Sequence, residues 1–219
     1  MIDLKQTGET SSSLTTATLL VFPCTDRSIM FEQLEDHSQH HPDRPTTHVV
    51  IMAKSYRNHL GQVRVDSHVR DTSNSDIATS VLIDSVKGVQ TILLHNQHIA
   101  YQLPFMFSEE GSFVSADAAD GSELSDHHWN TYSEDLGKTQ IENVTFEGVR
   151  IVSACVEDSI LTTTFERWYS RDMKLVGSIE RIGPYKGYSI RIRNLEYKEP
   201  ESLLFEIPSG FDILDVNLP

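Results

Sequence analysis

The sequence predicts a mainly β protein, α+β at most, built as an antiparallel meander that curls into an open half-barrel. The first observation is a strict alternation in residues 188–195, where Tyr188, Ile190 and Ile192 are apolar and the residues between them are polar. This pattern is typical of a strand with one dry and one wet face. The second observation is that segments rich in β-branched and aromatic residues recur, separated by short turns. About ten strands in one sheet rarely stay flat, so we expect a curved sheet with a concave face.

We expect the first 46 residues to form a loosely ordered arm and residues 47–219 to form a single β domain. The arm is rich in Ser and Thr at its start, with one short apolar run at residues 19–22 that would suit an edge strand. Within it, Ile29, Met30 and Leu34 are spaced for one face of a helix over residues 26–41. Asp26 is placed to cap this helix, and Pro42 would end it.

Within this domain we expect two runs of hairpins. Short polar turns at residues 58–61, 85–87 and 96–97 separate the strands of the first run. Those strands are expected over residues 47–56, 62–70, 77–84, 88–95 and 98–103. The second run is expected over residues 141–146, 149–156, 160–169, 173–182, 188–195 and 203–207.

A long acidic loop is expected between the two runs, over residues 104–135. This stretch contains eight acidic residues and no basic residue, in a chain of formal net charge −14. A loop of this length is usually functional or disordered. The overall charge opposes binding to nucleic acid, which needs clustered Lys and Arg, and opposes docking on an anionic membrane.

The sequence contains no segment long and apolar enough to span a membrane, and its first residues do not form a secretory signal peptide. Two cysteines, Cys24 and Cys155, allow one disulfide, but a small buried thiol is the commoner state of a cysteine in a strand pattern. These features leave the compartment and the pairing of the cysteines open.

We find no catalytic signature and expect no enzyme activity and no cofactor. The histidines at His37 and His41 would suit a metal only on a helix, and no further ligand pattern completes such a site. His127 and His128, and His95 and His98, read equally well as surface histidines. The acidic residues of the long loop do not follow the spacing of a calcium loop.

Glu166 and Glu180 fall on neighbouring predicted strands and could face each other as a carboxylate pair. Arg167, Arg181 and Arg191 lie equally near, so cross-strand ion pairs on a wet face are the simpler interpretation.

Several motifs resemble an uncharacterised family of exported bacterial proteins. The hairpin RNHLGQVR at residues 57–64 is followed in the same order by IDSVKGV at 83–89, LGKTQIE at 136–142, ERWYS at 166–170 and LFEIP at 204–208. The resemblance covers roughly residues 50–103 and 136–213. It implies a half-barrel of the lipoprotein-carrier type, similar to LolA and LolB, and a periplasmic or secreted location. Without an export signal in the sequence, a cytoplasmic location is the alternative.

The function that follows is non-catalytic binding of an apolar ligand on the concave face, such as an acyl chain, a lipid or a lipoprotein segment. The alternative is a protein-interaction or envelope-sensor module that docks through a strand edge or the acidic loop. The partner would then be a hydrophobic small molecule or a protein, with no nucleic acid and no membrane span. Alternation alone selects the expected lining residues, which are Phe165, Trp168, Leu175, Ile179, Ile190 and Ile192.

Overall fold

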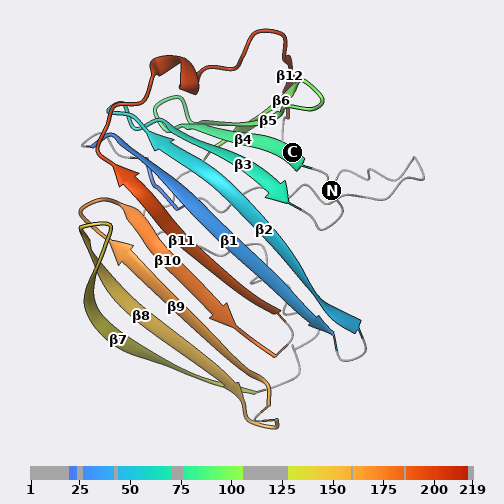
Figure 1. Ribbon diagram of the computed structural model, residues 1–219, viewed down its shortest axis with the longest axis vertical. Coiled ribbons are helices and arrows are strands. Elements are labelled where there is room, and N and C mark those ends of the chain that lie inside the picture. Colours follow the sequence, from blue (N-terminus) through green and yellow to red (C-terminus); the bar gives the residue numbers. More distant parts are fainter. Residues whose placement is uncertain are drawn as a thin grey trace.

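The computed structural model describes residues 20–23, 27–41, 44–70, 76–105, 128–158, 160–184 and 186–216. Within these ranges twelve strands form one sheet in the order β12-β6-β5-β4-β3-β2-β1-β11-β10-β9-β8-β7. Figure 1 shows this sheet as one continuous layer that twists from β7 to β12. Among the described strands the two edges, β7 and β12, do not pair with each other. The predicted open, curled and mainly antiparallel sheet is therefore confirmed.

The chain builds the sheet outward from its middle in two runs of hairpins. β1 pairs with β2 on one side and with β11 on the other, so it joins the two runs. The first run consists of β2 (Arg44–Arg57), β3 (Val63–Arg70), β4 (Asp76–Asp84), β5 (Val89–Leu94) and β6 (Ile99–Pro104). The second consists of β7 (Trp129–Ile141), β8 (Val144–Cys155), β9 (Thr162–Ser170), β10 (Leu175–Ile182) and β11 (Lys186–Glu196).

The helix expected over residues 26–41 is wrong, because this segment forms β1 (Ile29–His41) at the centre of the sheet. Ile29, Phe31, Gln33 and Glu35 are buried, and the residues between them are more exposed. The side chains therefore follow the period of a strand. Two of the buried residues are polar, which hides the alternation of hydrophobicity from a reading of the sequence.

The turn between β7 and β8 lies earlier than expected. The sequence suggested a break at residues 147–148, whereas the structure turns at Glu142 and Asn143, which both have positive φ (49° and 62°). Two consecutive residues in this conformation form the hairpin turn that matches strand twist, and Asn tolerates it well. Gly148 lies within β8, where the ring of Trp168 occupies the space that a Cβ would need.

Both ends of the second run differ from expectation. β7 begins at Trp129, so residues 129–135 belong to a strand and not to the acidic loop, whose residues 106–127 lie outside the described residues. The last expected strand, over residues 203–207, is wrong: Ser202–Phe205 forms a 3-10 helix, η3. The chain then returns as β12 (Asp212–Asp215), which pairs with β6 in parallel.

The two faces of the sheet differ in composition. We call the face that carries Ile51, Val65, Ile179 and Ile190 the apolar face, since these four side chains are at most 4% exposed. We call the opposite face, with Lys54, Asp66, Glu180 and Arg191, the polar face. The four apolar side chains have so little exposed surface that the protein itself covers this part of the apolar face.

Candidate functional site

The predicted lining residues do not all lie together. Ile179 pairs with Ile190 across β10 and β11, and Ile192 follows on the same side of β11, so these three form one apolar patch. All three are at most 4% exposed and belong to the main hydrophobic core. Phe165, two residues from the Arg167 that pairs with Ile179, shares the apolar face and is half-buried.

Trp168 and Leu175 lie elsewhere. Trp168 pairs with Ser178, which places its ring on the polar face, opposite Phe165. Leu175 is fully buried at the start of β10, and an isolated bridge joins it to Val21. A register shift between Val176 and Ser178 separates Leu175 from the regular part of β10. Alternation could not indicate this shift, because it arises from the fit between strands.

Next to the apolar patch, one row of the apolar face is partly open. The register aligns Ile151, Phe165, Arg181, Tyr188, His37 and Val49 across β8, β9, β10, β11, β1 and β2. Every side chain in this row is half-buried, in contrast to the adjacent row through Ile179 and Ile190. The imidazole of His37 stacks on the ring of Tyr188 with centroids 5.7 Å apart. This open row is an accessible part of the apolar face.

Arg181 sits in the open row between two aromatic residues. Its direct partners across the ladders are Phe165 on β9 and Tyr188 on β11. Among the described residues it takes part in none of the ion pairs. A half-buried guanidinium between apolar rings is suited to an anionic head attached to an apolar chain.

A polar cluster is buried in β1 and β2 beside this row. Gln33 donates its amide to the Glu35 carboxylate at 2.8 Å, and the Ser55 hydroxyl donates to Gln33 at 3.0 Å. His37 Nε2 lies 3.0 Å from the second oxygen of Glu35. Glu35 is fully buried, so these hydrogen bonds satisfy polar atoms that water cannot reach. The sequence analysis missed this cluster because it assigned β1 to a helix.

The segment around Leu20–Phe22 fastens to the far end of the core. Val176 donates its N–H to Leu20 O at 2.8 Å, and Phe22 donates to Lys174 O at 3.1 Å. The fully buried Arg57 reaches the same place and donates to the carbonyl oxygens of Phe22 and Met173. An edge strand was expected at residues 19–22. The described part of this segment, Leu20–Phe22, pairs briefly with the start of β10. The pairing of β10 with β11 ends at Ser178 and Arg191. The Leu20–Phe22 segment takes the place of β11 beside the start of β10.

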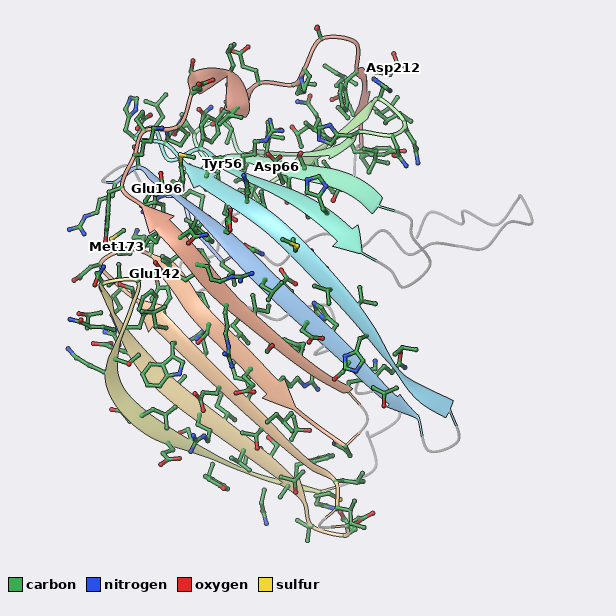
Figure 2. The ribbon with its side chains drawn as sticks, viewed as in Figure 1. Tyr56, Asp66, Glu142, Met173, Glu196 and Asp212 are labelled. Carbon is green, nitrogen blue, oxygen red and sulfur yellow. The ribbon has the colours of Figure 1, made fainter. Side chains whose placement is uncertain are left out.

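A second polar cluster lies on the polar face of β3, β4 and β5. Ser80 Oγ donates to the Asp66 carboxylate at 2.5 Å and contacts His95 Nε2 at 2.6 Å. Arg64 donates to Asp66 at 2.6 Å and to Leu204 O at 2.7 Å, which ties η3 to the sheet. Figure 2 shows Asp66 near Tyr56 on the neighbouring strand β2. Burial first, and then the charge of Asp66, raises the pKa of Tyr56.

This second cluster contains the residue types of a hydrolytic triad, but its geometry does not fit one. In a triad the carboxylate orients the imidazole. Here the Asp66 oxygen forms its hydrogen bonds with Ser80 and Arg64. Ser80 is 1% exposed and could not reach a substrate. The cluster is therefore a structural network that holds the C-terminal segment.

Glu166 and Glu180 are direct cross-strand partners, as their positions in the sequence suggested. Glu166 pairs with Arg150, whose Nε and Nη2 lie 3.2 and 3.0 Å from one carboxylate oxygen. The predicted preference for ion pairs is met here by an arginine of β8 and not by Arg167, Arg181 or Arg191.

At the end of β8, Cys155 is buried and free of any disulfide. Its thiol donates to Glu157 at 3.2 Å, and His128 Nδ1 lies 3.0 Å from the same carboxylate. These hydrogen bonds, first that of Cys155 and then that of His128, lower the pKa of Glu157 to about 2. Cys24, the other half of the disulfide considered above, lies outside the described residues.

The sequence analysis also considered metal ions and a membrane span. Among the described residues, no group of three or more His, Cys, Asp or Glu side chains could hold a metal ion. His127 and the acidic residues of the expected loop between positions 106 and 127 lie outside those residues, as does the side chain of His41. No described helix is long and apolar enough to cross a membrane.

Comparison with known proteins returns only distant structural similarity. No protein-family model and no curated protein matches the sequence. A LolA superfamily protein from Nitrosomonas europaea is 9% identical, with 84% of this chain and 92% of that chain covered and a TM-score of 0.38. A DUF1329 family protein from Desulfovibrio piger is 10% identical, with 83% and 90% covered and a TM-score of 0.35.

The MucA/MucB complex of Pseudomonas aeruginosa is also similar, at 12% identity and a TM-score of 0.39, with 88% of this chain and 59% of that chain covered. The uncharacterised family that the sequence motifs resemble implied a half-barrel similar to LolA and LolB. At these scores and identities the similarity transfers no ligand or partner to this chain, so the functional argument rests on its own geometry.

Proposed function

We propose that the protein is a non-catalytic binding protein that holds an apolar chain against the open row of its apolar face. The observation that supports this is the half-exposed row through Ile151, Phe165 and Tyr188, which borders the buried patch of Ile179 and Ile190. Apolar surface left accessible beside a core gains roughly 2.5 kcal/mol for each 100 Å² that a ligand covers. An acyl chain, a lipid or a lipoprotein segment fits such a row.

Arg181 narrows the ligand class to apolar chains with an anionic head. Its guanidinium lies within the row and makes no ion pair among the described residues, so a carboxylate or phosphate would give it a partner. The compartment that suits this function is outside the cytoplasm, as for the exported proteins whose motifs the sequence resembles.

A fluorescent fatty-acid probe tests the proposal. Ile151→Asp places a charge in the open row and should weaken probe binding at least tenfold. The control is Val152→Asp, because Val152 is the next residue of β8, is also half-buried and faces the polar side. Equal loss in both variants, or probe binding that neither variant changes, would remove the apolar face as the site.

The head-group assignment has its own test. Arg181→Gln should weaken binding of a fluorescent fatty acid about tenfold and leave binding of the corresponding fatty alcohol unchanged. Arg193→Gln, an exposed arginine on the polar face of β11, should change neither. If both ligands weaken equally in Arg181→Gln, the arginine acts through packing and not through its charge.

A second function is docking of a protein through a strand edge. β7 is a 13-residue edge strand whose side chains are mostly exposed, which is a template for an added strand. A register shift between Asp135 and Gly137 bends its middle, so its first half, before Asp135, is the straighter template. A protein of this kind would ignore the fatty-acid probe, so the same titration separates the two functions.

A further inference from the structure

A small hollow lies on the polar face, away from the open row. The register places Trp168, Ser178 and Arg191 side by side on β9, β10 and β11. A serine between two long side chains leaves a space of about 180 Å³ above it. The walls of this hollow are Glu166, Trp168, Ser178, Ile179, Glu180 and Arg191.

One hydrogen bond and a close backbone contact position the Trp168 ring as a wall of the hollow. Its Nε1–H donates to Glu166 at 2.8 Å, and its six-membered ring covers Gly148, where a Cβ would lie 2.6–2.7 Å from three ring atoms. The second oxygen of Glu166 accepts from Arg150. Both carboxylate oxygens of Glu166 are thus engaged, and this residue positions the indole.

Two opposite charges border the hollow without neutralising each other. Glu180 and Arg191 are exposed and lie diagonally across β10 and β11, and neither forms an ion pair among the described residues. Glu180 also faces the carboxylate of Glu166 directly across the ladder, an arrangement of like charges that costs stability. A bound cation near Glu180 would relieve that repulsion.

We propose that this hollow binds a small zwitterion that carries an alkylammonium group and a phosphate group. The ammonium would sit against the Trp168 ring and the Glu180 carboxylate, which is a cation–π arrangement with a counter-charge. The phosphate would accept from Arg191 and from the Ser178 hydroxyl, which are direct partners across β10 and β11.

The size and the spacing of the hollow select this class. Pockets for drug-sized ligands measure roughly 300–1,000 Å³, so the space here suits a smaller molecule. Trp168 and Arg191 are two strands apart, about 10 Å between their backbones. An α-amino acid, whose two charges flank one carbon, is too short to reach both, whereas a phosphate and an ammonium joined by a spacer can.

Tryptophan fluorescence can test the site directly. The chain has two tryptophans, so Trp129→Phe leaves Trp168 as the only reporter. In this background, phosphocholine should produce a saturable change in emission. Tetramethylammonium alone and inorganic phosphate alone should bind at least tenfold more weakly. A change that never saturates, or none, would overturn the proposal.

Charge variants then assign the two ends of the ligand. Glu180→Gln should weaken phosphocholine and tetramethylammonium at least fivefold and leave phosphate unchanged. Arg191→Gln should weaken phosphocholine and phosphate at least fivefold and leave tetramethylammonium unchanged. The matched controls are the exposed Glu206→Gln and Arg193→Gln, which should bind as the parent does. Equal losses in variants and controls would show that only net charge matters and would overturn the site.

The source of the ligand is distinguished by vesicles. Phosphatidylcholine vesicles that compete with phosphocholine would identify a lipid headgroup as the ligand, and vesicles without effect would identify a free molecule. Ser178→Leu fills the hollow and should abolish binding in either case. Because this site lies on the polar face, Ser178→Leu should leave the fatty-acid probe bound. Failure of the zwitterion site can therefore be told apart from failure of the proposed function.

Discussion

The two faces of the sheet become buried in different ways. On the apolar face, β-branched residues recur on strand after strand, so that Ile51, Val65 and Ile190 each expose at most 1% of their surface. On the polar face burial depends more on individual fits between strands, such as Phe146 against Gly177 or the network around Ser80. The first kind of burial follows from periodicity along one strand. The second requires knowing which residues meet across strands.

The largest expected effect comes from placing a charge on each face in turn. Ile51→Asp buries a carboxylate at a position that is 1% exposed and paired with Glu35, and should cost on the order of 4 kcal/mol of unfolding free energy or more. Met52→Asp changes the next residue of β2, which is 44% exposed on the polar face, and should cost about 0.5 kcal/mol or less.

Urea denaturation of the two variants measures this difference. Similar losses of stability would mean that the polar face is as tightly covered as the apolar face, which would break the comparison. The same reasoning applies to Ile190, where a charge at a position of 1% exposure should also unfold the protein.

The apolar face could be predicted from the sequence to the extent that periodicity defines it. The alternation of Ile190 and Ile192 was interpreted correctly, and the turns around residues 58–61 and 96–97 separate the strands that form β2 to β6. β1 was not recognised as a strand because its buried positions include Gln33 and Glu35, so its apolar residues do not alternate with polar ones. The hydrophobic pattern there resembles one turn of a helix, and only pairing with β2 and β11 makes it a strand.

Features that depend on fits between strands could not be predicted. The hydrophobic alternation along β10 does not show the register shift beside Gly177, and nothing in ERWYS indicates that Trp168 lies over Gly148. Glycine in a strand often marks such a close approach, and this signal could have moved the predicted turn away from Gly148. The parallel return of β12 to β6 joins residues more than 100 positions apart, which local pattern does not encode.

A glycine pair sharpens the view that the polar face depends on single fits. A Cβ at Gly177 would lie 2.7–2.9 Å from the ring of Phe146, which is fully buried. Gly177→Ala should therefore cost about 2 kcal/mol. A Cβ at Gly148 would meet Trp168 at a similar distance, but this ring is half-buried and can rotate outward. Gly148→Ala should cost about 1 kcal/mol.

Fluorescence distinguishes the two glycine variants in a second way. In the Trp129→Phe background, Gly148→Ala should shift the emission of Trp168 to longer wavelength, because the displaced ring becomes more exposed to water. Gly177→Ala should leave the emission unchanged. An unchanged spectrum in Gly148→Ala would contradict the close seat of the indole on β8.

The smallest expected effect concerns the network around Ser80 and its dependence on pH. Burial first, and then the nearby guanidinium of Arg64, lowers the pKa of His95 below its ordinary value. The unfolded chain therefore takes up the proton more readily than the folded protein does. The stability that depends on neutral His95 is present above about pH 6.5 and decreases as the pH falls below it. The other charged groups that act on this imidazole are Asp66, His68 and His98.

His95→Gln keeps a hydrogen-bonding side chain next to Ser80 but removes the titration. Stability measured by urea denaturation between pH 7 and 5 should decline less in this variant, by an amount below about 1 kcal/mol because the site is partly exposed to solvent. His98→Gln, which removes the other imidazole that contacts Phe211, should keep the decline of the parent protein. The lowered pKa values of Asp84, Glu157 and Glu199 act in the same direction but only at more acidic pH, since carboxylates ordinarily titrate near pH 4. If the decline of stability with falling pH persists in His95→Gln and disappears in His98→Gln, then His98 and not His95 takes up the proton. That result would contradict the network described here.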